Sequence, residues 1–178
     1  MRVEDWLELP DDSALREIVG GELFVAPLPT TRHQRIASNL LFELFSHLRE
    51  TKRGEVLAAP TGVRLSDLDV VEPDLLVVLI EHAYRVEDAY VVGPPDLVVE
   101  ILSPGTAGRD LRVKRDLYER SGVPEYWIVD PLRGEVEVLR LEGGAYGRFG
   151  LFTRADTLRS AVLPNLALAL ASVLPEKP

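Results

Sequence analysis

Two carboxylates interrupt apolar segments of the sequence. Glu100 lies near the end of the run 95–102, which is rich in β-branched residues and flanked by prolines. Asp74 begins a second such run, which continues to Ile80. Short apolar runs of this composition are typical of buried strands, where an unpaired carboxylate is costly. Each acid therefore needs a metal ion, a cationic side chain, or water at the strand end.

A lysine lies on the apolar face of the helix predicted after Glu100. At about 100° per residue, the segment 109–121 gathers its apolar side chains, Tyr118 among them, on one half of the helix. Lys114 lies near the middle of that half, and Asp110 lies one turn earlier. Lys114 can extend to solvent or pair with Asp110 at i,i+4 spacing. The alternative is that Lys114 points to the same place as Glu100.

Two carboxylates on adjacent strands and a lysine are residue types that place a divalent cation beside a phosphate. Carboxylate oxygens bind Mg²⁺ or Mn²⁺, and the metal lowers the pKa of a bound water. A lysine can orient or help to deprotonate that water, or neutralise charge on the phosphate. Asp74, Glu100 and Lys114 thus suggest metal-dependent hydrolysis of a phosphate ester.

The predicted elements can bring these residues together. The helix 109–121 joins the Glu100 strand to a strand at 126–129, and a right-handed crossover makes the two strands parallel. The same crossover lays Lys114 over the sheet near Glu100. The order of the predicted helices and strands along the chain indicates an α/β (α+β) fold, with a central mixed sheet flanked by helices and with β additions at both ends.

Two further side chains are candidate site residues, and each also has an ordinary structural interpretation. Glu22 starts the second strand of a hairpin predicted around Gly20 and Gly21; it is either a solvated charge or a third acid at the site. A helix capped by Thr30 or Thr31 carries His33 on its buried face. His33 is either a packed, hydrogen-bonded residue or a contact to phosphate at the mouth of the site.

The sequence resembles the putative restriction endonuclease family of bacteria, a branch of the PD-(D/E)XK nuclease superfamily. The resemblance covers nearly the whole chain, and its most specific part runs from Glu100 to Pro131. The matching residues are Gly21-Glu22-Leu23, His33, Pro73-Asp74, Val99-Glu100-Ile101-Leu102-Ser103-Pro104, Asp110, Lys114, Tyr118 and Gly122-Val123-Pro124-Glu125-Tyr126-Trp127-Ile128-Val129-Asp130-Pro131.

The resemblance implies a restriction-endonuclease-like core and a metal-dependent nuclease. Asp74 and Glu100 would ligate Mg²⁺ or Mn²⁺, with the backbone carbonyl of Ile101 as a further ligand. The superfamily pattern puts its lysine two residues after the second acid, where this chain has Leu102. The resemblance implies that Lys114 takes that role, with Asp110, Tyr118, Glu22 and His33 as support.

Composition limits the other possibilities. The chain has 178 residues, a length that suits one domain over 1–178, and no cysteine, which excludes disulfides and thiolate metal sites. No signal peptide and no membrane-spanning run is recognisable, so we expect a cytoplasmic protein. The net charge of −9 argues against a general nucleic-acid coat protein and predicts weak DNA affinity without divalent cations.

Two hypotheses remain. The first is a metal-dependent endonuclease that hydrolyses DNA phosphodiester bonds, and a homodimer is expected for cutting two strands. The second is a catalytically degenerate module that keeps the fold and the site but acts in nucleic-acid or protein binding or assembly; the acidic balance and Leu102 favour it.

Overall fold

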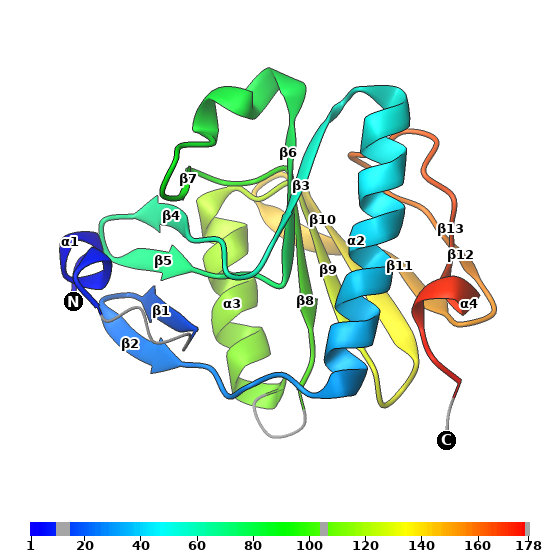
Figure 1. Ribbon diagram of the computed structural model, residues 1–178, viewed down its shortest axis with the longest axis horizontal. Coiled ribbons are helices and arrows are strands. Elements are labelled where there is room, and N and C mark those ends of the chain that lie inside the picture. Colours follow the sequence, from blue (N-terminus) through cyan, green and yellow to red (C-terminus); the bar gives the residue numbers. More distant parts are fainter. Residues whose placement is uncertain (10–14, 104–106, 177–178) are drawn as a thin grey trace.

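A six-stranded mixed sheet forms the centre of the protein (Figure 1). The computed structural model describes residues 1–9, 15–103 and 107–176, with only the backbone described for 107–110. The strand order in the sheet is β11-β10-β9-β8-β6-β3. Its strands are β3 (Gly54–Ala58), β6 (Leu75–Leu79), β8 (Leu97–Ile101), β9 (Glu125–Asp130), β10 (Glu135–Glu142) and β11 (Ala145–Thr153).

The predicted crossover is present in this sheet. Helix α3 (Ala107–Ser121) connects β8 to β9, and these two strands pair in parallel, with Glu100 opposite Ile128. Strand β6 pairs with β8 on the other side in antiparallel register, with Leu75 opposite Val99. The start of β6 and the end of β8 therefore meet at one edge of the sheet, where the two predicted acids are found.

Successive side chains of each strand point to opposite faces of the sheet, so the strands contribute to two separate apolar cores. Helix α2 (Thr31–Thr51) covers one face, where Leu75, Val99 and Trp127 pack in the same cluster as its buried leucines. Helix α3 covers the other face, where Val98 packs with Tyr118. Figure 1 shows the sheet between these two helices. Because alternate residues of a strand share a face, Glu100 points to the α3 side, as Val98 does.

A smaller sheet lies beside α3 and contains the N-terminal hairpin. Its order is β2-β1-β5-β4-β7, and the hairpin turns at Gly20 and Gly21, whose φ angles of 58° and 82° suit a two-residue hairpin loop. Strands β3 and β4, which follow each other closely in the sequence, belong to the two different sheets. The remaining elements are α1 (Val3–Leu7), β1 (Arg16–Val19), β2 (Glu22–Val25), β4 (Val63–Ser66), β5 (Asp69–Val71), the 3-10 helix η1 (Ile80–Arg85) and β7 (Val91–Val92).

The C-terminal segment packs on the α2 face. Its apolar pattern fits strand or helix equally, and both occur: β12 (Thr157–Leu158) pairs with β13 (Leu168–Ala169), and α4 (Leu170–Val173) follows. Leu163, Leu168 and Leu170 belong to the same apolar core as α2. Among the described helices, none is long and apolar enough to span a membrane.

A buried carboxylate ties this segment to the central sheet. Glu125, at the start of β9, is fully buried and accepts hydrogen bonds from the Trp127 indole, the Ser160 hydroxyl and the backbone N–H groups of Ala161 and Val162. Without this carboxylate the buried Trp127 indole and the half-buried N–H of Ala161 would lose the acceptor that the structure gives them, and an unpaired buried donor is costly.

We therefore expect Glu125→Ala to lower the free energy of unfolding by about 3 kcal/mol, because it orphans several buried donors. In a domain of this size the melting temperature should fall by roughly 6–12 °C, measured by thermal unfolding. The control is Glu142→Ala, which removes an exposed acid that pairs with Arg140 on β10 and should cost less than about 0.5 kcal/mol. Equal melting temperatures for the two variants would contradict the assignment.

Candidate active site

Lys114 joins two elements that lie far apart in the sequence. Its ammonium nitrogen is 2.9 Å from Oε1 of Glu100 on β8 and 2.8 Å from Oε1 of Glu17 on β1. The lysine side chain is 16% exposed, and the side chains of Glu17 and Glu100 are 9% and 12% exposed. Lys114 therefore points to Glu100, as the second of the two sequence-based alternatives has it, and forms a largely buried ion-pair bridge.

Tyr118 lies one turn after Lys114 on α3 and contacts the same carboxylate. Its hydroxyl donates a hydrogen bond of 2.7 Å to Oε1 of Glu100, and its ring packs edge-on against Tyr126. Oε1 of Glu100 thus receives both the ammonium and the phenol. The other oxygen of Glu100 has no hydrogen-bond partner among the residues that the structure describes.

Asp74 is held at the same edge of the sheet by two donors. The backbone N–H of Ile101 donates to its Oδ2 at 2.7 Å, and the His33 Nε2 lies 3.2 Å from both carboxylate oxygens. Thr30 caps α2 by accepting a hydrogen bond from the backbone N–H of His33, which fixes the first turn of the helix. His33 is thereby placed over the start of β6, next to Asp74.

The carboxylate that sequence reasoning missed is Glu17. It lies in a short hairpin strand with polar neighbours, so its burial carries a weaker signal in the sequence than that of Glu100. Glu22, the hairpin acid expected as a third contributor, is exposed on β2. Asp69 anchors the hairpin by accepting hydrogen bonds from the Gly20 N–H and from Arg120 of α3, which holds β1 beside the lysine.

The site carries more negative charge than Lys114 can balance. Burial is the largest cause that raises the pKa of Glu100, to about 7, and the charges of Asp74 and Glu17 add to the rise, while Lys114 and the Tyr118 hydroxyl oppose it. Burial alone would lower the pKa of Lys114, but the charges of Glu100 and Glu17 outweigh burial and raise it, so the lysine stays charged.

His33 responds to the same excess of negative charge. Burial lowers its pKa, but the hydrogen bond to Asp74 and the charges of Asp74 and Glu100 outweigh this effect, so the pKa is raised above its ordinary value. A hydrogen bond to the backbone of Ile101 adds to the rise. His33 is therefore an acid-base group that touches a candidate metal ligand.

The donor set suits a hard divalent cation. No group of three or more His, Asp or Glu side chains in the described part of the chain is arranged to hold a metal ion. Mg²⁺, however, keeps several waters and is commonly bound by one or two carboxylates together with substrate phosphates. Asp74 and Glu100 supply two such carboxylates, and the unbalanced charge around them is what a cation would neutralise.

Three sequence-based expectations need separate mention. The side chain of Asp110 lies outside the described residues, although its backbone is part of α3. Ile101 contributes its N–H to Asp74, and the role of its carbonyl as a ligand stays a prediction. Leu102, in the position of the superfamily lysine, donates its backbone N–H to the carbonyl of Val129 and continues the pairing of β8 with β9.

Comparison with known proteins identifies a family and a similar solved structure. A family model, Uma2, described as a putative restriction endonuclease, matches residues 3–171. A crystal structure described as a putative nuclease belonging to DUF820 from Anabaena variabilis ATCC 29413 superposes with a TM-score of 0.81, at 19% identity over 97% of each chain. At that identity the likeness shows the fold, and it confirms the predicted mixed α/β nuclease-like architecture. No curated protein matches the sequence.

The charge imbalance predicts a pH-dependent cost of removing the lysine. The pKa of Glu100, raised to about 7 from 4.5, means that this group stabilises the folded state below pH 4.5 and that the contribution is lost as the pH rises through 7. Lys114→Met raises that pKa further, so we expect a loss of about 3–5 kcal/mol at about pH 8 and a smaller one at about pH 5.5, measured by urea unfolding.

Arg112→Met on the exposed face of the same helix is the matched control, because it also replaces a cation by Met. It should change stability by less than about 0.5 kcal/mol at either pH. A Lys114→Met protein whose loss of stability is the same at both pH values would contradict the charge imbalance.

Proposed function

The chain belongs to the Uma2 family, described as putative restriction endonucleases, and on that premise we propose that it is an endonuclease that hydrolyses DNA phosphodiester bonds with a divalent cation. The observation that carries the proposal is the charge cluster at the end of β8, where Lys114 pairs with Glu17 and Glu100 and Asp74 adds a negative charge beside Glu100. A divalent cation, bound together with a phosphate group, would neutralise the excess negative charge at this edge of the sheet.

Asp74 and Glu100 would hold Mg²⁺ or Mn²⁺, with the carbonyl of Ile101 as a further oxygen ligand. The bound cation supplies a water of lowered pKa and neutralises charge on the phosphate. Ile101 orients Asp74 through its N–H, and Tyr118 orients Glu100 through its hydroxyl. These two hydrogen bonds fix one oxygen of each carboxylate and leave Oε2 of Glu100 for the cation.

Lys114 would position the attacking water or stabilise charge that develops on the phosphorane. Glu17 would act through the lysine, because it pairs with the ammonium from the side of the hairpin while Glu100 pairs with it from β8. His33, whose pKa is raised by Asp74, would contact the phosphate or deliver a proton to the leaving oxygen. A homodimer, expected for cutting both strands, stays a prediction.

The test is cleavage of supercoiled plasmid DNA with Mg²⁺ or Mn²⁺. We expect Asp74→Asn and Glu100→Gln to abolish cleavage, because each removes the charge of a metal ligand. Lys114→Ala should slow cleavage about 10²–10⁴-fold, as expected for a group that moves or orients a proton. The controls are Asp116→Asn and Arg112→Ala on the solvent face of α3. A Lys114→Ala protein that cleaves as fast as the wild type would refute the role of the lysine.

A second function is favoured by one feature of the site. Lys114 is held by two carboxylates, and Leu102 stands where the superfamily lysine would be. Both fit a module that has kept the fold and lost turnover, and that now binds nucleic acid or protein.

The activity and the stability of the acid variants, measured together, separate the two functions. A module without turnover has no need of unbalanced buried charge, so Asp74→Asn and Glu100→Gln should keep its binding function and leave its melting temperature equal or higher. For a nuclease the same variants lose cleavage, whatever their stability. Thermal unfolding and plasmid cleavage measured on the same preparations decide between these outcomes.

A further inference from the structure

A pocket lined by arginines lies beside the candidate active site. It encloses about 390 Å³, and we name it the arginine pocket after Arg32, Arg133 and Arg154, which line it together with Thr153 and Glu176. The whole protein has a net charge of −9. Three arginines from different parts of the chain along one hollow are therefore a local exception to the acidic character of the chain.

The pairing register places the arginine pocket on the same edge of the sheet as Asp74 and Glu100. Ile101 pairs with Val129, Asp130 pairs with Glu135, and Glu135 pairs with Thr153. The end of β11 thus lies abreast of the end of β8, three strands away. With neighbouring strands about 4.8 Å apart, the separation across the sheet is about 14 Å. This is a span of a few nucleotides along a nucleic-acid strand.

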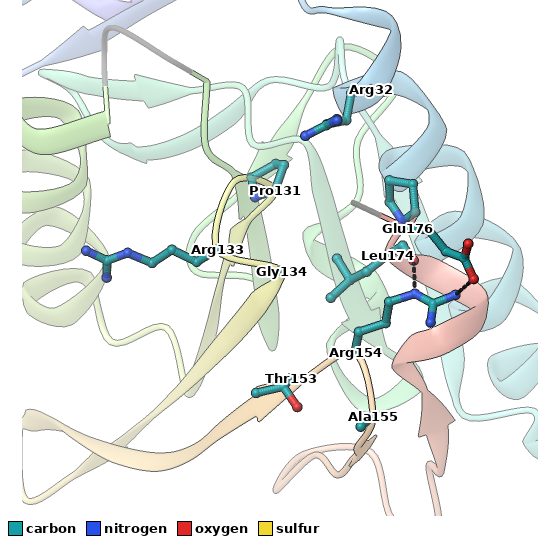
Figure 2. A pocket seen from close by; sticks show the side chains of 10 residues that line it. Arg32, Pro131, Arg133, Gly134, Thr153, Arg154, Ala155, Leu174 and Glu176 are labelled. Carbon is teal, nitrogen blue, oxygen red and sulfur yellow. Dashed lines mark hydrogen bonds and ion pairs between the residues drawn. The ribbon is translucent and has the colours of Figure 1, made fainter. Parts of the chain in front are cut away.

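Arg32 connects the pocket to the site. It precedes His33 in the first turn of α2, and His33 contacts Asp74. Figure 2 shows the Arg32 side chain extending over the pocket in the direction of Pro131, while Arg133 extends away from it. In the portion of the chain that the structure describes, no carboxylate forms an ion pair with Arg32. Its charge is available to an anion from outside.

Arg154 already holds an anion that can be displaced. Its Nε donates to the carbonyl of Leu174 at 3.1 Å, and its Nη2 lies 3.3 Å from the carboxylate of Glu176 (Figure 2). The Glu176 side chain is 84% exposed and that of Arg154 is 42% exposed. An exposed pair of this kind contributes little to stability, so the position of the Glu176 carboxylate is one that a phosphate oxygen can take.

We propose that the arginine pocket binds a backbone phosphate of the DNA substrate, a few nucleotides from the bond to be cleaved. The inference rests on the proposed function. Guanidinium groups bind phosphate oxygens in a bidentate manner and release counterions from the nucleic acid. Arg32 and Arg154 supply two such groups on one edge, and Asp74 and Glu100 would hold the cation that neutralises the scissile phosphate farther along that edge. The pocket gives an acidic protein a local site for its polyanionic substrate.

The test is binding of a fluorescein-labelled DNA duplex of about 12 base pairs, and of its single strand, by anisotropy in EDTA between about 50 and 200 mM NaCl. We expect Arg32→Ala and Arg154→Ala each to weaken binding roughly 5- to 20-fold at low salt and to reduce the salt slope by about 1. Arg49→Ala is the matched control: it removes an exposed arginine of the same helix, about 25 Å from Arg32.

Removal of the competing carboxylate should act in the opposite direction. We expect Glu176→Gln to strengthen binding, and Glu142→Gln, which removes another exposed, arginine-paired acid on β10, to change it less. Arg154→Lys keeps the charge and should retain most of the salt slope. Thermal unfolding confirms that each variant is folded.

Equal affinities and salt slopes for Arg32→Ala, Arg154→Ala and Arg49→Ala would overturn the arginine pocket, as would a wild type that binds neither DNA form. The proposed function is judged separately, by plasmid cleavage and its loss in Asp74→Asn. If the protein cleaves DNA but neither arginine substitution changes DNA binding, the proposed function stands and only the phosphate-binding role of the arginine pocket is refuted.

Discussion

The candidate site depends on one electrostatic constraint: one lysine is paired with two largely buried carboxylates, and a third carboxylate lies close by. Lys114 bridges Glu17 and Glu100, and Asp74 adds a further negative charge to the same edge of the sheet. Removing charged groups from water is costly unless each is paired, and here the pairing is incomplete. Burial, with the neighbouring carboxylates adding to it, raises the pKa of Glu100, and Glu100 and Glu17 raise the pKa of Lys114. The incomplete pairing is the physical reason to expect a divalent cation at the site.

The fold brings the residues of this cluster together from distant parts of the sequence. The parallel pairing of β8 and β9 requires a crossover, and that crossover is α3, which carries Lys114 over Glu100. The N-terminal hairpin brings Glu17 to the lysine and is fixed to α3 through Asp69 and Arg120. Helix α2, on the opposite face, places His33 on Asp74. Three segments distant in the sequence therefore converge on one edge.

Much of this could be predicted from the sequence. An acid in an apolar run and a lysine on the apolar face of a helix each violate the local pattern, so Asp74, Glu100 and Lys114 were identifiable, and handedness placed the lysine over the strand. Glu17 was not, because a four-residue hairpin strand has too little periodicity to show that an acid is buried. Glu22, which directly follows the turn glycines, was the acid that the sequence pattern pointed to, yet it is exposed. The arginine pocket could not be predicted from the sequence, because its residues come together only when β11 pairs with β10.

The most direct test of the account is a calorimetric titration of the protein with Mn²⁺, repeated on Asp74→Ala combined with Glu100→Ala and on the control Asp116→Ala. The account predicts that the wild type and the control bind the ion and that the double variant does not, because only the double variant loses the unbalanced carboxylates. A wild type that binds no Mn²⁺, alone or with duplex DNA present, would contradict the central claim. So would a double variant that binds as tightly as the wild type.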